Sequence, residues 1–195
     1  MRRLILIVAV LFASTAAQAH VGIGDTSGFV HGFMHPLSGI DHILAMVAVG
    51  LFAAHLGGRA LYLVPLSFVG MMVVGGALGM AGLHLPYVEV GIGLSVVVLG
   101  IAVAFGLNMP TAVAMILVGS FAIFHGHSHG TEMPETASGF EYGAGFILAT
   151  AALHALGIGL GVLIGKASEA GGRRVLQTVG GAMAMAGVAI LTGFI

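Results

Sequence analysis

The sequence predicts an all-α membrane protein with about six transmembrane helices that follow a cleaved N-terminal signal peptide. Hydrophobic residues make up 58% of the 195 residues, whereas charged residues make up only 7%. A soluble domain of this size cannot cover so much apolar surface with so few charges, so the lipid bilayer must be the solvent. Glycine is abundant at 33 residues, as is typical of membrane helices that pack closely.

The first residues are typical of a secretory signal peptide. Arg2 and Arg3 form a basic start, residues 4–12 form an apolar core too short to span a bilayer, and residues 17–19 match a small-x-small cleavage site. We expect cleavage after residue 19, which leaves a single transmembrane transport domain over residues 20–195. His20 would then be the mature N-terminus, where its α-amine and imidazole together offer two ligands to a metal ion. The alternative is that His20 only begins a floppy tail.

Apolar runs separated by short polar turns define the expected spans. Residues 20–34 are expected to form a short external segment, and the longest connection is expected over residues 125–141. The fourth span is short unless the helix continues past residue 125. Small-xxx-small patterns in the second and fifth spans fit either internal packing or contacts in a homo-oligomer. The six expected spans are residues 36–56, 61–83, 87–105, 110–124, 142–165 and 175–195.

The charged residues predict how the chain crosses a bacterial inner membrane. If the mature N-terminus lies outside, the basic residues of the mature chain all fall in inner loops, namely Arg59, Lys166, Arg173 and Arg174. This distribution follows the positive-inside rule. Most acidic residues fall on the outer side. Both ends of the mature chain are therefore expected in the periplasm.

The segment from His35 to Met46 carries ionisable side chains into an apolar run. Pro36 is suited to the first turn of a helix, because its missing N–H would have no partner there. If the helix starts at Pro36, then His35, His42 and Met46 share one stripe, with the two imidazoles about 10 Å apart along the axis. Asp41 lies beside His42. An Asp–His pair inside a membrane span is costly, which indicates function; the alternative is a pair that only locks helices together.

A second group of histidines follows the fourth apolar run. If the helix continues, His125, His129 and Glu132 share one face, while His127 points elsewhere. The alternative is a solvated loop that concentrates metal ions without belonging to a pathway. His154 is a lone histidine in the fifth span, and it is either a metal ligand or a hydrogen-bonded interior residue.

These residue types indicate a metal site without thiolate ligands. The chain has no cysteine, which excludes disulfides, thiolate metal sites and cysteine nucleophiles. Imidazole and carboxylate ligands suit divalent ions such as Ni²⁺, Co²⁺, Cu²⁺ and Zn²⁺, and the methionines leave Cu⁺ open. A net charge of −1 offers no basic surface for nucleic acid. No Gly-rich phosphate loop is present, so we do not expect direct ATP coupling.

Two motifs resemble those of the HupE/UreJ family, and the resemblance covers the whole chain. The motifs are His35-Pro-x-x-Gly39-x-Asp41-His42-x-x-x-Met46 and Phe-His125-Gly-x-x-His129-Gly-x-Glu132. The resemblance implies a bacterial inner-membrane permease that imports Ni²⁺ or Co²⁺ as substrate, holds no tightly bound cofactor and serves enzymes such as hydrogenase or urease. It assigns the metal to His35, Asp41, His42, His129 and Glu132. The further candidates are His125, Met46, His154 and His20.

Two other functions remain open from the residues alone. An intramembrane hydrolase could use a metal-activated water, although neither a His-Glu-x-x-His motif nor a Gly-x-Ser-x-Gly motif occurs. A non-transporting envelope protein that binds or assembles metal would use the histidine-rich segment alone. Metal flux across a membrane separates a permease from both.

Overall fold

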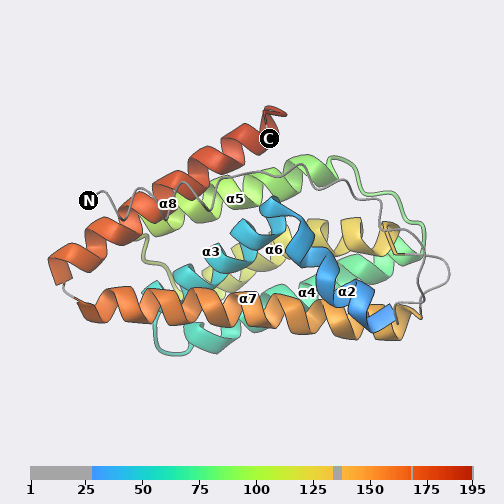
Figure 1. Ribbon diagram of the computed structural model, residues 1–195, viewed down its shortest axis with the longest axis horizontal. Coiled ribbons are helices and arrows are strands. Elements are labelled where there is room, and N and C mark those ends of the chain that lie inside the picture. Colours follow the sequence, from blue (N-terminus) through green and yellow to red (C-terminus); the bar gives the residue numbers. More distant parts are fainter. Residues whose placement is uncertain (1–27, 134–137, 168, 195) are drawn as a thin grey trace.

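The computed structural model describes residues 28–133, 138–167 and 169–194, and these residues form helices and connections without a strand. The all-α prediction is confirmed for this part of the chain. The predicted signal peptide and His20 lie outside the described residues. The helices are α2 (Gly28–Ser38), α3 (Ile40–Leu56), α4 (Ala60–Met80), α5 (Val88–Phe105), α6 (Thr111–Thr131), α7 (Gly139–Ala167) and α8 (Glu169–Leu191) (Figure 1).

Five of these helices, α4 to α8, are each long and apolar enough to cross a membrane. They match the second to sixth spans expected from the sequence, and Pro65 does not interrupt α4. The pair α2 and α3 also passes this test together, but the two helices are bent by 83°. The described residues therefore contain up to six crossings if the bent pair counts as one.

The first span differs from the prediction. The helix does not begin at Pro36, because Pro36 lies inside α2, which already begins at Gly28. The chain breaks instead at Gly39, whose φ of −98° and ψ of 123° are extended. The bend separates His35 on α2 from His42 on α3, so the single stripe of His35, His42 and Met46 is wrong.

A close approach explains why glycine stands at the break. A Cβ added at Gly39 would lie 2.6 Å from Asp41 Oδ1 and 3.1 Å from His42 Nδ1. Without that Cβ, the Asp41 carboxylate folds back over the start of α3 and accepts a hydrogen bond from the His42 backbone N–H at 2.8 Å. An acidic side chain in the first turn also suits the positive end of the helix dipole.

The expected connection over residues 125–141 is also shorter than predicted. Helix α6 continues to Thr131 and α7 begins at Gly139. The helical alternative for the second histidine group is thus the one that forms. His125 and His129 lie in α6, and Glu132 caps its C-terminal end.

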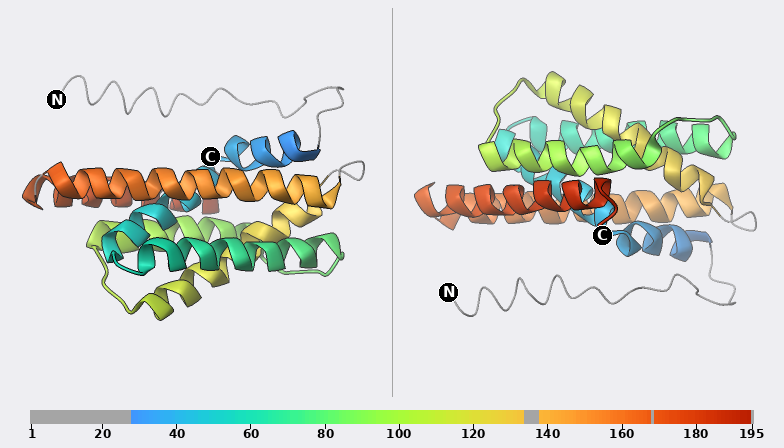
Figure 2. Two further views of the ribbon diagram at one scale, coloured as in Figure 1. Left: turned by 90° about the horizontal axis from the view of Figure 1, so that it is seen from below. Right: turned by 90° about the horizontal axis from the view of Figure 1, so that it is seen from above.

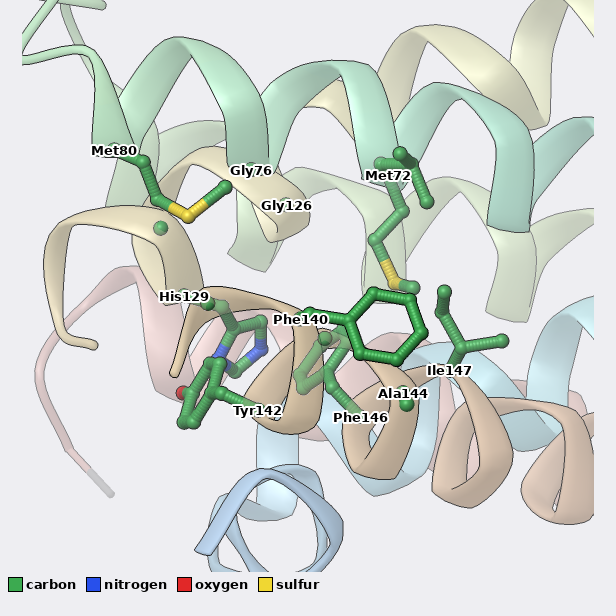
Figure 3. A pocket seen from close by; sticks show the side chains of 14 residues that line it. Met72, Gly76, Met80, Gly126, His129, Phe140, Tyr142, Ala144, Phe146 and Ile147 are labelled. Carbon is green, nitrogen blue, oxygen red and sulfur yellow. The ribbon is translucent and has the colours of Figure 1, made fainter. Parts of the chain in front are cut away.

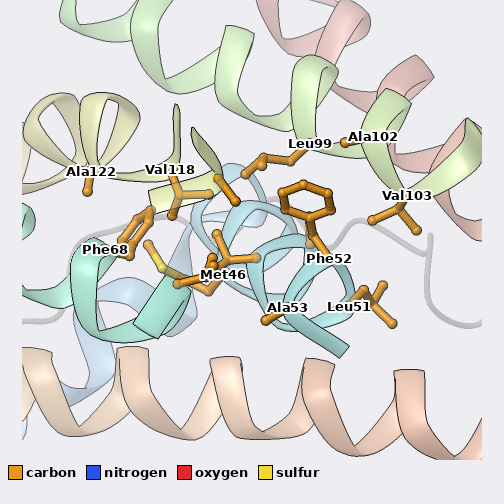
Figure 4. Packing of buried hydrophobic residues seen from close by; sticks show 14 of the residues in the cluster. Met46, Leu51, Phe52, Ala53, Phe68, Leu99, Ala102, Val103, Val118 and Ala122 are labelled. Carbon is orange, nitrogen blue, oxygen red and sulfur yellow. The ribbon is translucent and has the colours of Figure 1, made fainter. Parts of the chain in front are cut away.

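Helix α3 occupies the centre of the bundle and is covered by α4, α5 and α7 (Figures 1 and 2). Figure 2 shows α4, α5 and α6 on one side of α7 and α2 on the other. The apolar core surrounds α3, with Phe52, Phe68 and Leu99 among its fully buried members (Figure 4). Met46, a candidate ligand from sequence, is fully buried in this core.

Glycines allow the helices to touch along their backbones. A Cβ on Gly126 of α6 would collide with the carbonyl oxygen of Met72 in α4, and a Cβ on Gly75 would collide with the carbonyl oxygen of Ile123. On the other side of α3, Gly50 meets Gly157 of α7. The small-xxx-small patterns of the second and fifth spans therefore serve internal packing.

The bundle has two chemically different ends. We call the end where α4 and α6 finish and α7 begins the site end. The opposite end is where α4 and α6 begin and α7 finishes. Its described basic residues are exposed, and they are Arg59, Lys166, Arg173 and Arg174.

Candidate metal site

Three potential ligands meet at the site end, where the last turn of α2 reaches the last turn of α6. Ligand atoms of His35, His129 and Glu132 all lie within 4.8 Å of one another. His35 Nε2–H donates a hydrogen bond to Glu132 Oε2 at 2.9 Å, and Ser128 Oγ donates one to Glu132 Oε1 at 3.0 Å. An ion that binds here would replace the His35–Glu132 hydrogen bond. Two imidazoles and a carboxylate suit a borderline divalent ion.

The hydrogen bond from His35 lowers the pKa of Glu132 below its ordinary value. Partial burial opposes this shift, and the hydrogen bond from Ser128 adds to it. The Glu132 side chain is about half exposed, with a relative accessibility of 51%. Its carboxylate is therefore ionised at neutral pH and still in contact with water, which suits a first point of contact for a hydrated cation.

A second pair of groups lies behind the first, at the start of α3. Asp41 Oδ1 accepts a hydrogen bond from His42 Nδ1–H at 2.9 Å. This assignment leaves the lone pair on His42 Nε2, which has no hydrogen-bond partner in the described structure. His42 is only 8% exposed. A carboxylate that holds one ring nitrogen while the other stays free is the usual arrangement around a metal-binding histidine.

His125 is oriented in a similar way by a serine. Ser95 Oγ donates to the carbonyl of Ile92 at 2.6 Å, so its single proton is already used. The 2.9 Å contact between Ser95 Oγ and His125 Nε2 must then be donated by the imidazole. This leaves the lone pair on His125 Nδ1, which is buried and has no hydrogen-bond partner in the described structure.

Four imidazoles form a continuous row, which we call the histidine row. Its members, in spatial order from the site end inward, are His35, His129, His42 and His125. The distance between ring centroids is 4.7 Å from His35 to His129, 4.3 Å from His129 to His42 and 4.9 Å from His42 to His125. Helices α2, α3 and α6 each supply at least one ring, so the 83° bend between α2 and α3 is what allows the row to form.

His129 occupies the middle of this arrangement. It is 4% exposed, and neither ring nitrogen has a hydrogen-bond partner in the described structure. Its ring packs on Phe146 at 4.0 Å between centroids. A buried imidazole with two unsatisfied nitrogens is costly unless another species binds it. His129 can therefore bind an ion together with either of its neighbours in the histidine row, His35 or His42.

The structure brings six of the sequence-predicted residues together, and they are His35, Asp41, His42, His125, His129 and Glu132. His154 lies deeper, and its ring contacts that of Phe68, which in turn contacts the ring of His125. His127 points away from the row, and its Nε2–H donates to the carbonyl of Leu83 at 2.7 Å.

Sequence reasoning missed Ser95, Ser128 and Tyr142, which surround these ligands. Ser95 is the only hydroxyl residue of α5, and a lone buried hydroxyl in an apolar helix is the signal that could have identified it. Tyr142 packs its ring 6.1 Å from that of His35. No sequence pattern singles out Ser128 or Tyr142, because their role depends on how α6 and α7 meet α2.

A cavity of about 260 Å³ adjoins the site between α4, α6 and α7. Its lining is largely apolar, with Met72, Phe140 and Ile147 among its walls, and His129 and Tyr142 provide its polar groups (Figure 3). An apolar chamber does not suit a hydrated cation. The histidine row, rather than this cavity, is the feature that can carry an ion.

Comparisons with known proteins agree on one family. The family model described as HupE / UreJ protein matches residues 8–190. The chain is 50% identical to Protein HupE of Rhizobium leguminosarum bv. viciae over 186 residues, which cover 95% of this chain and 95% of that protein. No solved structure matches the chain.

Proposed function

The chain belongs to the HupE/UreJ family, and on that premise we propose that it is a permease that imports Ni²⁺ or Co²⁺ across the bacterial inner membrane. It is then a transporter and not an enzyme, and the metal is its substrate. The observation that carries the proposal is the histidine row, which leads from a half-exposed carboxylate into the interior of a membrane bundle.

Capture begins at Glu132 and His35. The ionised Glu132 attracts cations from the outer solution, and His35 and His129 replace part of the metal's water. Imidazole and carboxylate ligands favour Ni²⁺ and Co²⁺ over harder ions such as Mg²⁺ and Ca²⁺. Glu141, at the start of α7, adds a further exposed acid at this end.

Passage inward follows the spacing of the row. Because neighbouring ring centroids are less than 5 Å apart, an ion can contact the next imidazole before it leaves the previous one. The free nitrogens of His42 and His125 are available as successive ligands. Asp41 and Glu132 together supply two negative charges, which offset those of a divalent ion that has lost its water.

The membrane potential determines the direction in which the metal ion moves. A charge that crosses a membrane gains about 2.3 kcal/mol per 100 mV, so a dication gains about 4.6 kcal/mol per 100 mV when the cell interior is negative. The exposed basic residues of the opposite end favour a cytoplasmic position for that end. The site end then faces the periplasm, and the imported ion becomes available to nickel enzymes such as hydrogenase or urease.

Flux through purified protein tests this proposal. The protein is reconstituted into liposomes that contain a nickel-sensitive fluorophore, and external Ni²⁺ is added with and without an inside-negative potential. We expect quenching that exceeds that of protein-free liposomes and increases with the potential. Cobalt added as a competitor ranks the two ions. Binding without flux would contradict transport and favour a metal-assembly role.

A further inference from the structure

His154 is a buried histidine that the histidine row does not include. It lies in α7, is 2% exposed, and neither ring nitrogen has a hydrogen-bond partner in the described structure. Burying an imidazole without a partner costs free energy, so such a group in a folded protein needs a reason. Its backbone is held firmly, because its carbonyl oxygen lies where α3 passes α7 at Gly50.

An aromatic ring joins His154 to the row. Phe68 of α4 is fully buried, and its ring centroid lies 5.5 Å from that of His125 and 5.1 Å from that of His154. The Phe68 and His154 rings meet edge to face at 85°. A single side chain therefore separates the innermost member of the row from His154.

His154 also lies deeper than the row. His125 is six residues from the end of α6, or about 9 Å along the helix, whereas His154 is fifteen residues from the start of α7, or about 22 Å. Thr150, one turn before His154 on the same face, is buried and donates to the Met72 sulfur at 3.7 Å. Hydroxyl, thioether and imidazole groups thus continue inward where the row ends.

We propose that His154 is a transport residue that receives the metal ion from His125 beyond the ring of Phe68. This inference rests on the proposed function, since it extends the same pathway. An ion that left His125 without a further ligand would enter the apolar core around α3, where an unpaired charge is strongly disfavoured. His154 supplies an imidazole lone pair at that point, because neither ring nitrogen has a hydrogen-bond partner in the described structure.

The test separates transport from binding at the site end. His154→Leu and His154→Gln are compared with the wild type for uptake of radioactive nickel by cells that lack other nickel importers. The same proteins, purified in lipid nanodiscs, are titrated with Ni²⁺ by calorimetry. His127→Gln is the matched control, because His127 is a buried histidine that faces away from the row and glutamine can still donate to Leu83.

We expect both His154 variants to lose about tenfold or more of the uptake rate while the nickel affinity of the site end stays as in the wild type. The control should keep both properties. Wild-type uptake in both His154 variants at equal membrane abundance would overturn the inference. Loss of nickel binding together with uptake would also overturn it, since His154 would then be structural. If the wild type itself takes up no nickel, the proposed function fails instead.

Discussion

The two ends of the bundle differ in the ionisable side chains that they carry and in the direction in which these side chains point. At the site end, acidic and imidazole side chains turn toward one another and leave ring nitrogens free. At the opposite end, the described basic residues turn outward to solvent. A second cavity, of about 380 Å³, lies there and is lined by His55, Asn108 and Arg173 among others. In the proposed permease, ligands are therefore concentrated where an ion would enter, and positive charge is kept where it would leave.

Asp41→Asn, at the site end, should cause the largest loss of nickel uptake among these changes. Asparagine keeps the size and can still accept from His42 Nδ1–H, so the change removes mainly the negative charge that offsets a desolvated dication. We expect nickel uptake to fall about 100-fold. The control is Glu89→Gln, which removes an exposed acid from the first turn of α5. Equal losses in the two variants would mean that acids act only by general attraction of cations.

Acidification should suppress uptake by protonating the ligands. Protons and metal ions compete for the same lone pair of an imidazole, and metal binding requires the neutral ring. Nickel uptake should therefore fall as the pH decreases from about 7.5 to about 5.5. Glu132 does not contribute to the fall, because its lowered pKa keeps it ionised throughout. A flat profile would contradict ligation by histidine.

Ser95→Ala should lower nickel uptake to an intermediate extent, because Ser95 orients the His125 ring. Loss of the hydroxyl leaves a buried imidazole N–H without an acceptor, which costs about 1–3 kcal/mol and frees the ring to change tautomer. We expect uptake to fall about tenfold. Ser95→Thr restores the hydroxyl and should recover most of the rate. Equal uptake in Ser95→Ala and the wild type would show that the serine does not position His125.

Gly39→Ala should have the smallest effect of these changes. The new methyl group would lie 2.6 Å from Asp41 Oδ1, so the carboxylate must leave its rotamer, at a cost of about 0.5–1.5 kcal/mol. We expect about a threefold loss of uptake. Gly70→Ala is the control, since a Cβ there meets nothing within 4 Å. If both variants behave alike, the bend does not depend on the missing Cβ.

Most of the fold could be predicted because the apolar runs are separated by clear turns. Helices α4 to α8 correspond to the expected spans, although α6 extends to Thr131 instead of ending at residue 124 and α8 begins at Glu169 instead of residue 175. Helix α2 was missed because its glycines and moderate polarity resemble a loop. Its small residues Gly28, Gly32 and Pro36 are nevertheless spaced four apart, and they are the buried face that packs on α7. The same spacing of small residues indicates close packing in the second span.

The sequence predicts which residues belong to the site, but it does not predict how they are arranged in space. Spacing along the chain relates His125 to His129, because both lie on one helix face. It could not relate His35 to Glu132, which are 97 residues apart and meet only because α2 turns back at Gly39. Ser95 comes from a third helix and carries no motif, so only the packing of α5 against α6 reveals it.

The most direct test of the pathway is uptake of radioactive nickel by cells that lack their own nickel importers, with the wild type compared with His42→Ala at equal membrane abundance. His42 links the half-exposed capture site to the buried end of the histidine row. We predict that the wild type takes up nickel and that the variant does not exceed cells without the protein. Equal uptake by the two proteins would contradict a pathway through the histidine row.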